Sequence, residues 1–263
     1  MSEPSKEELL AGGNVTNVYR FGNTVRREVK PESKNIHELL KHLERKGYPY
    51  SPKFLGVDEK GREILSFIEG EPGHAPLKEY MQSNEALQEI AKMLRLYHDS
   101  VSDFPFDDQW HSLDQTPEPR EVICHNDFAM YNIIFHQQRP IGIIDFDVAA
   151  PGPRLWDIAY TLYTCVPFSR FSFSESGEKI HYQPLLHANQ RKQRMALFFE
   201  SYGMEWKENA VEMVLLRLEG LYRTIARKAS EGDAAFQKMI EEGHIRHYQE
   251  DIAFIHKHKG EWV

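Results

Sequence analysis

The first 69 residues combine runs of alternating apolar and polar side chains with one stretch of helical spacing. Alternation is typical of strands that bury one face, so we expect strands at residues 15–21, 25–29, 53–57 and 62–68. Gly22-Asn23, between the first two strands, suits a two-residue hairpin turn. Apolar side chains three and four positions apart predict one amphipathic helix at residues 34–46, with Ser33 as its N-cap and Gly47 at its end.

Beyond residue 70 the pattern becomes mostly helical. Residues 69–73, Glu-Gly-Glu-Pro-Gly, interrupt regular structure and suit a link between two parts of the chain. We expect helices at residues 84–100, 154–166, 184–202, 207–230 and 233–258. An insertion at residues 168–182, in which Phe and Ser alternate, either covers a substrate cleft or is an ordinary surface loop. The change of pattern predicts an α+β protein of two lobes, residues 1–69 and residues 70–263.

The stretch from residue 121 to residue 160 carries oxygen-bearing side chains at the ends of short predicted strands. Asp127 and Asn132 fall on the loop between two apolar runs, and Asp145 ends a third run. Carboxylate and amide oxygens suit a hard cation such as Mg²⁺. A lone Asp at a strand end more often caps a turn, but capping does not account for all three residues together. The pattern therefore favours phosphoryl transfer.

Composition narrows the class of protein. The formal net charge of −8 argues against nucleic-acid binding, which requires clustered Lys and Arg. No apolar run reaches the roughly 18 to 20 residues of a membrane span, and the polar N-terminus is unlike a signal peptide. Cys124 and Cys165 have the spacing of neither a metal site nor a disulfide framework. We therefore expect a cytoplasmic protein that binds neither nucleic acid nor membrane.

The spacing of the acidic residues is close to that of known kinases. His125-Asn126-Asp127, an Asn five residues after Asp127, and Asp145-Phe146-Asp147 after one hairpin are similar to the catalytic loop and D-F-G motif of protein kinases. The fuller pattern is C-H-N-D-F-x-x-x-N-I-I-F, followed by G-I-I-D-F-D-x-A-x-P-G-P-x-x-W-D-I-A. It resembles the aminoglycoside phosphotransferase and choline kinase-like family, which has the protein-kinase-like fold. This resemblance extends over most of the chain.

The resemblance implies a role for each residue of the central stretch. Asp127 would be the catalytic carboxylate that accepts the proton of the substrate hydroxyl. Asn132 and Asp145 would bind the Mg²⁺ ions that bridge the phosphates of ATP. His125 would either pack beneath the catalytic loop or act directly in catalysis, and Asp157 would brace that loop from the following helix. Asp147 would either contact a second metal ion or accept backbone N–H groups.

The N-terminal part departs from the protein-kinase pattern. Residues 12–17, Gly-Gly-Asn-Val-Thr-Asn, are not a G-x-G-x-x-G loop, and there is no V-A-I-K lysine. The cation that matches this lysine on the second strand is Arg27, or alternatively Arg26. Arginine can hold phosphate oxygens bidentately, although its geometry differs from that of lysine. On the following helix, His37 flanks the apolar face whereas Glu38 lies opposite it, so we expect His37 to lie nearer the cleft.

Residues 65–68 match the place where the family strand meets the adenine ring. The backbone groups of Ser66 and Ile68 are the candidates, and they do not separate ATP from GTP. Asn126 replaces the HRD arginine, and no A-P-E motif follows, so we expect a small hydroxylated acceptor rather than a protein. Glutamates of the C-terminal helices either offer carboxylates to a polycationic acceptor or form solvated faces; these are Glu200, Glu205, Glu208, Glu212 and Glu219.

Two other classes of protein remain as alternatives. A pseudokinase, which binds nucleotide without turnover, would suit the altered glycine loop and the arginine in place of lysine. A two-metal phosphoesterase would need several histidines around paired metals, but the two motifs quoted above contain just one histidine, His125. The intact Asp127, Asn132 and Asp145 favour an ATP-dependent small-molecule kinase over both.

Overall fold

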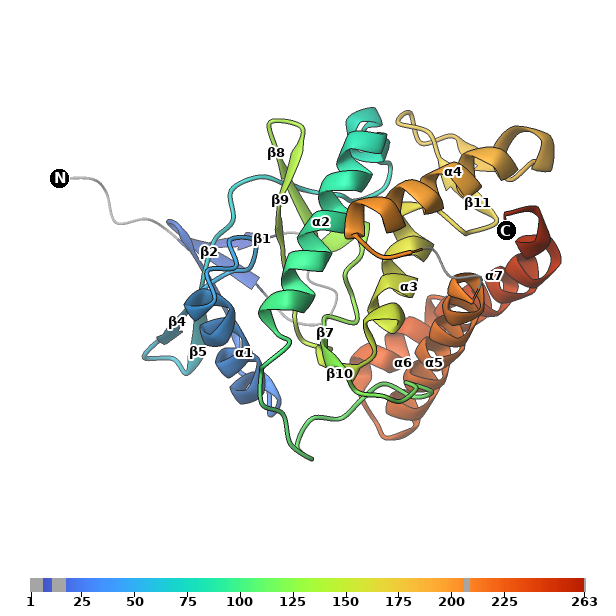
Figure 1. Cartoon of the computed structure of the whole chain (residues 1–263). Coiled ribbons are helices and arrows are strands. Elements are labelled where there is room, and N and C mark those ends of the chain that lie inside the picture. Colours follow the sequence, from blue (N-terminus) through green and yellow to red (C-terminus); the bar gives the residue numbers. More distant parts are fainter. Residues whose placement is uncertain (1–6, 11–17, 206–208, 263) are drawn as a thin grey trace.

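The computed structural model describes residues 7–10, 18–205 and 209–262. Its N-terminal part is built on a five-stranded antiparallel sheet of order β1-β2-β3-β5-β4 (Figure 1). The strands are β1 (Glu8–Leu10), β2 (Val18–Phe21), β3 (Thr24–Glu28), β4 (Phe54–Val57) and β5 (Arg62–Ser66). The predicted hairpin is confirmed between β2 and β3, where Gly22 has a φ of 58°. Residues 11–17, which include the atypical glycine loop and the start of the first predicted strand, lie outside the described residues.

Helix α1 (Ser33–Arg45) covers this sheet. Its buried stripe includes Leu39, Leu40 and Leu43, which have almost no exposed surface. Ser33 is the first helical residue, so its prediction as N-cap is wrong: its Oγ accepts from the backbone N–H of Lys30, 2.9 Å away. Gly47, with a φ of 73°, allows the chain to turn away after the helix.

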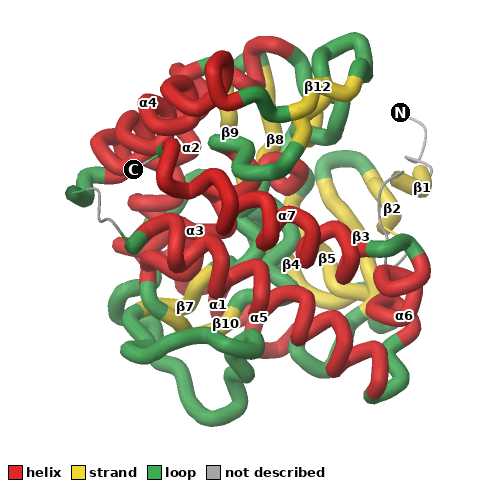
Figure 2. Tube along the Cα trace, turned by 90° about the vertical axis from the view of Figure 1, so that its right-hand side faces the viewer, coloured by secondary structure: helices red, strands yellow, loops and turns green. Residues whose placement is uncertain are grey.

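The C-terminal part is mainly helical, as predicted. Its helices are α2 (Asn84–Ser100), α3 (Arg154–Cys165), α4 (Pro184–Tyr202), α5 (Ala210–Ser230), α6 (Ala234–Glu241) and α7 (His244–His258). Helix α2 packs against α4, and α5 packs against both α3 and α7. Figure 2 shows the strands of the N-terminal sheet grouped at one side of the molecule, away from α4. None of the helices in the described part of the chain has the length and apolar character that a membrane crossing needs.

Three small sheets complete this part. Strand β6 (Glu71–Pro72) pairs with β8 (Ile133–His136), which pairs with β9 (Arg139–Ile143). Strand β7 (Val122–Cys124) pairs with β10 (Ala150–Gly152), and β11 (Phe171–Phe173) pairs with β12 (Lys179–His181). A Cβ on Gly142 would lie 2.8 Å from Cδ1 of Ile68. The glycine therefore lets the link between the two parts pack tightly on β9.

Two expectations change in the C-terminal part. The single helix predicted at residues 233–258 is wrong, because Gly243, with a φ of 83°, separates α6 from α7. The insertion at residues 168–182 contains the hairpin β11–β12, whose turn includes Gly177 with a φ of 84°. This hairpin contributes to a cavity wall described below.

Candidate active site

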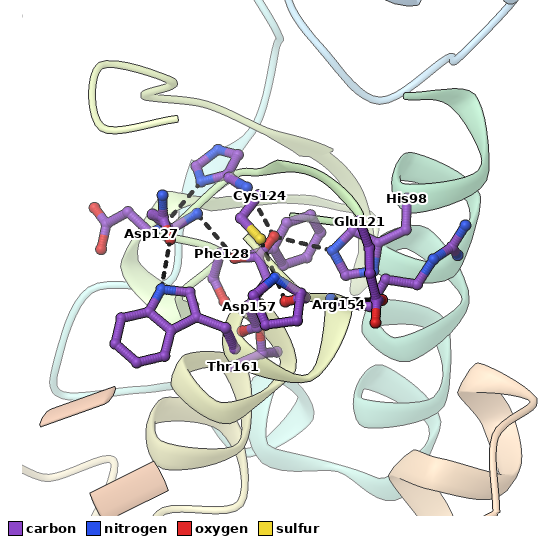
Figure 3. A network of polar contacts seen from close by, with 12 residues as sticks. His98, Glu121, Cys124, Asp127, Phe128, Arg154, Asp157 and Thr161 are labelled. Atoms are coloured by element: carbon purple, nitrogen blue, oxygen red, sulfur yellow. Dashed lines mark hydrogen bonds and ion pairs between the residues drawn. The ribbon is translucent and has the colours of Figure 1, made fainter. Parts of the chain in front are cut away.

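Asp157 on α3 holds the backbone of the loop that follows β7. Its Oδ2 accepts from the N–H of His125 at 2.7 Å, and its Oδ1 accepts from the N–H of Asn126 at 2.8 Å. Nε2 of His98, on α2, lies 3.0 Å from Oδ2 (Figure 3). Burial raises the pKa of Asp157, but the hydrogen bond and charge of His98 and the contacts of His125 outweigh this effect and leave it lowered. Asp157 thus ties this loop to two helices.

His125 lies beneath the same loop. Its side chain is fully buried, and Phe146 packs against its ring with a centroid distance of 4.5 Å. Nδ1 is 3.2 Å from the backbone N of Asp127, which identifies Nδ1 as the acceptor in this contact. Burial lowers the pKa of His125 to about 4, so the ring is neutral at pH 7. A neutral ring supports the backbone of Asp127 without placing a charge beneath it.

Asp127 sits where several donors converge. Nδ2 of Asn132 donates to Oδ2 of Asp127 at 2.7 Å and to its backbone carbonyl at 3.0 Å. The hydroxyl of Tyr131 donates to Oδ1, and this hydroxyl is also 3.0 Å from that of Tyr160. Burial raises the pKa of Asp127 to about 7, although the donors from Tyr131 and Asn132 act in the opposite direction; the nearby Asp145 raises it further. A carboxylate with this pKa can exchange a proton near neutral pH.

Asp145 ends the strand pair β8–β9 in an unusual backbone conformation. Its φ of 65° lies in the left-handed region, which Asp adopts more readily than most residues. Its side chain is 50% exposed, so its carboxylate is accessible from solvent. The N–H of Ile144, the preceding residue, donates to the backbone carbonyl of Asn132 at 3.0 Å. The chain thereby holds Asn132 and Asp145 at neighbouring positions.

Arg27 and His37 meet on one buried carboxylate that was absent from the predicted site. Nε of Arg27 donates to Oε1 of Glu63, and Nε2 of His37 lies 2.6 Å from Oε2. Glu63 is 1% exposed and is the cross-strand partner of Arg27 in the β3–β5 pairing. Directly paired residues point to the same face of a sheet. Arg26 points to the opposite face, where its Nε is 3.8 Å from Asp58.

Asp147 links the two parts of the molecule. Its Oδ1 lies 2.6 Å from Nη2 of Arg27, and its Oδ2 lies 2.7 Å from Nζ of Lys30. Arg27 also lies 3.7 Å from Asp145. Burial raises the pKa of Asp147, but the charges of Arg27 and Lys30 leave it lowered overall. Two cations of the N-terminal part therefore lie beside the acidic strand end.

Ser66 and Ile68 differ in whether their backbone groups already form hydrogen bonds within the protein. The N–H of Ser66 donates to the carbonyl of Lys53 at 2.9 Å, and its Oγ accepts from the N–H of Lys53. In the described part of the chain, Ile68 takes part in no backbone–backbone hydrogen bond. Its amide and carbonyl are thus the freer pair in this segment.

Sequence reasoning missed three residues of this arrangement. Glu63 shares the inner face of β5 with Leu65, so strand alternation combined with the β3–β5 register would have revealed it. Lys30 lies just beyond β3, and no strand pattern singles it out. Tyr131 occupies an unspecified position of the motif, one residue before Asn132. Its contact with Asp127 depends on the short helical turn η2 (Met130–Asn132).

A cavity of about 530 Å³ adjoins this site. Tyr131 and Tyr160, which lie next to Asp127, form part of its wall. The rest of the wall includes residues of α3, α4, α7, the hairpin β11–β12 and the segment from Gly73 to Gln82. Its volume is in the usual range for small-molecule sites. No group of three His, Cys, Asp or Glu side chains suited to a metal ion was found within residues 7–10, 18–205 and 209–262.

Comparison with known proteins identifies the family. Residues 102–173 match the model of the phosphotransferase enzyme family. The trifolitoxin immunity protein of Rhizobium leguminosarum bv. trifolii is 40% identical over 208 residues, which cover 77% of this chain and 76% of that protein. The chain belongs to the phosphotransferase enzyme family. The resemblance seen in the sequence is thereby confirmed, and with it the expectation of a phosphotransferase.

Solved structures confirm the kinase-like fold. A choline kinase from Cryptosporidium parvum is 12% identical, with a TM-score of 0.62 and coverage of 98% of this chain and 91% of that one. An aminoglycoside phosphotransferase from Streptomyces rimosus, solved with ADP and streptomycin, is 14% identical, with a TM-score of 0.55 and coverage of 83% and 93%. At these identities the likeness establishes the two-lobed α+β fold.

Proposed function

We propose that this protein transfers the γ-phosphoryl group of ATP, or of GTP, to a hydroxyl of a small molecule. One observation carries the proposal. The carboxylate of Asp127, with a pKa of about 7, is hydrogen-bonded by Tyr131, and Tyr131 also forms part of the wall of a cavity of about 530 Å³. An acceptor in that cavity can therefore present its hydroxyl to a carboxylate able to take the proton.

The reaction is a direct displacement. The acceptor oxygen bonds to the γ-phosphorus, the bond from this phosphorus to the bridging oxygen breaks, and the nucleoside diphosphate leaves. The hydroxyl proton passes to Asp127. Each oxygen of a carboxylate has two lone pairs, so Tyr131 and Asn132 can hold Asp127 while it accepts this proton. His125 and Asp157 contribute indirectly, by fixing the backbone on which Asp127 sits.

The donor chemistry near Asp127 fits Mg²⁺. Nδ2 of Asn132 donates to Asp127, which leaves the side-chain oxygen of Asn132 as a possible ligand beside the half-exposed carboxylate of Asp145. Both are hard oxygen donors of the kind that Mg²⁺ prefers. We propose that these two residues hold the ion. When bound, it would neutralise charge on the phosphate oxygens.

For the nucleotide phosphates, we propose Arg27, with Lys30 as a second cation. Glu63 binds Arg27 through one carboxylate oxygen and His37 through the other, and Arg27 lies beside Asp145 and Asp147. We propose that the free backbone groups of Ile68 bind the adenine or guanine edge, with Ser66 confined to positioning the strand. Both cysteines are free and buried, which fits action in the reducing cytoplasm.

Nucleotide-coupled screening of hydroxylated metabolites and antibiotics tests the proposal. The expected result is release of ADP or GDP together with a phosphorylated product, lost in Asp127→Ala. Nucleotide binding without turnover by any acceptor, unchanged in Asp127→Ala, would instead identify a pseudokinase.

The relative from Rhizobium favours a second role built on the same chemistry. It is named for immunity to trifolitoxin, and its 40% identity to this chain suggests that the present protein also protects against a toxin. Expression of the wild-type protein in a trifolitoxin-sensitive strain tests this. Protection that disappears in Asp127→Ala would indicate inactivation by phosphorylation, whereas protection that persists would indicate sequestration.

A further inference from the structure

The cavity beside Asp127 has an unusual charge. Three arginines of the described chain are buried: Arg191, Arg194 and Arg217. None of them has an ion-pair partner within residues 7–10, 18–205 and 209–262, although Arg27 and Arg170 each bind two carboxylates. Two of the three, Arg191 and Arg194, belong to α4 and form part of the cavity wall.

Arg191 is held by aromatic rings and a single carbonyl. Its Nη2 donates to the carbonyl of Ser169 at 2.7 Å, and its guanidinium carbon lies 4.2 Å from the ring centroid of Tyr182 and 5.0 Å from that of Trp262. Its Nη1 is buried and has no hydrogen-bond partner within the described residues. Burial lowers its pKa to about 10, so it remains a cation at pH 7.

Among the described residues, the hydrogen-bond partners of Arg194 are likewise neutral oxygens. Its Nη1 donates to the carbonyl of Gln82 at 2.9 Å and to Oδ1 of Asn84 at 3.0 Å, and its Nη2 donates to the carbonyl of Cys165 at 2.9 Å. These contacts use three of its five N–H donors and bring no negative charge to it. Burial lowers its pKa for this reason.

No acidic residue of the described chain belongs to the wall of this cavity. Most of the wall is apolar or aromatic, with rings from Tyr131, Tyr160, Tyr163, Phe171, Phe173, Tyr182 and Tyr248. The nearby Asp251 is committed to Arg170 at 2.6 Å and to the hydroxyl of Tyr163 at 2.6 Å. Of the glutamates considered from the sequence, Glu212 and Glu219 pair instead with Lys259 and Arg223. The wall is thus positively charged, which disfavours a polycation.

We propose that the acceptor is an acidic molecule, with a carboxylate that faces Arg191 and Arg194, an aromatic or apolar body and a hydroxyl directed to Asp127. This inference rests on the proposed kinase function and specifies its substrate class. The aromatic wall would bury the body of the acceptor. Asp251 and Glu261 raise the pKa of Arg191 from a distance, but both are hydrogen-bonded to tyrosines and neither forms an ion pair with it in the described chain. The carboxylate of the acceptor would supply a direct ion pair for these two buried arginines, which are otherwise costly to bury.

The test uses one hydroxyl compound in three forms: 4-(hydroxymethyl)benzoate, its methyl amide and 4-(hydroxymethyl)benzylamine. ATP-dependent phosphorylation and calorimetric binding are measured for the wild-type protein, Arg191→Gln, Arg191→Lys and Asp127→Ala. We expect the acid to have a KM and a dissociation constant at least about tenfold lower than the amide, with the amine weakest. Arg191→Gln should remove this preference and Arg191→Lys should retain it. Arg223→Gln is the matched control, because Arg223 forms an exposed ion pair with Glu219 and does not belong to the cavity wall.

The outcomes separate the two proposals. Asp127-dependent transfer that favours the amide or the amine overturns the acidic acceptor and leaves the kinase function standing. Tighter, Arg191-dependent binding of the acid without transfer to any form supports the anion site and counts against catalysis. Equal binding of all three forms by the wild-type protein overturns the inference. This comparison needs no variant, so the inference can be tested even if Arg191→Gln folds poorly.

Discussion

Nη2 of Arg27 lies 2.6 Å from Oδ1 of Asp147, so the N-terminal sheet contacts the acidic segment after β9 through a direct ion pair. Arg27 also contacts Glu63 and lies 3.7 Å from Asp145. These three carboxylates raise the pKa of Arg27 further above its ordinary value, despite the opposing effect of burial. Arg27 is therefore held between the N-terminal sheet and the acidic segment by carboxylates from both.

Removing the charge of Arg27 should destabilise the fold. Arg27→Gln would leave Glu63, which is 1% exposed, with His37 as its remaining partner. Breaking one side of a buried pair costs about 3 kcal/mol or more, and we expect a loss of this size in urea unfolding. The double variant Arg27→Gln/Glu63→Gln should lose less unfolding free energy than the two single variants lose together. Lys41→Gln, which removes an exposed pair with Glu38, should change stability by less than about 0.5 kcal/mol.

Asp127→Asn should abolish most turnover without affecting nucleotide affinity. The amide preserves the shape of the side chain but cannot accept the hydroxyl proton, and loss of such a group typically lowers rates roughly 10²- to 10⁴-fold. Steady-state kinetics with calorimetric measurement of ADP binding checks both expectations. Turnover within about twofold of the wild-type rate would show that another group takes the proton.

The rate should depend on pH through Asp127. Because burial raises the pKa of this carboxylate to about 7, the fraction able to accept a proton falls as the pH falls through that value. We expect an acidic limb of kcat/KM near pH 7, because the pH dependence of kcat/KM reports the groups of the free enzyme. Tyr131→Phe removes a donor that stabilises the carboxylate, so this limb should move to higher pH. If the acidic limb of Tyr131→Phe lies at the same pH as that of the wild-type protein, the limb does not report the titration of Asp127.

Asp157→Asn should lower thermal stability in a pH-dependent way. Its charge accepts hydrogen bonds from two backbone N–H groups and His98 within a fully buried site, and such bonds contribute about 1.5 to 3 kcal/mol each. Its pKa is lowered on folding, so its contribution is present above the unfolded value of about 3.9 and is lost as the pH falls towards the folded value. The Tm difference from the wild-type protein should therefore shrink below about pH 4. A constant difference would indicate a packing effect.

Helices with clear end signals were predictable. Residues 84–100 and 184–202 match α2 and α4, because Ser83 accepts from the N–H of Ala86 at the first boundary and Gly203 adopts a left-handed φ of 79° at the second. The break at Gly243 was not predicted, because the helical spacing of apolar residues continues on both sides of it. Strand β1 was not predicted, because a strand of three residues is too short to show an alternation of apolar and polar side chains.

The central motif predicted that its acidic and amide side chains lie close together, but it did not predict the contacts within the N-terminal part. Asp127, Asn132 and Asp145 lie within one loop and one hairpin, so their proximity follows from local sequence. Glu63 is 36 residues from Arg27 along the chain, and their contact depends on the register of two strands. Strand pairing of this kind is a tertiary property that short-range patterns do not determine.

The position of Glu63 also bears on regulation. In protein kinases the strand cation pairs with a glutamate on a mobile helix, and movement of that helix switches activity. Here both members of the pair belong to strands that are hydrogen-bonded to each other, β3 and β5, whereas α1 contributes only His37. Displacement of α1 would remove His37 but leave Arg27 and Glu63 together. Arg27, the cation that we propose for the phosphates, is thus held by the pairing of two strands, and its contact with Glu63 does not require α1.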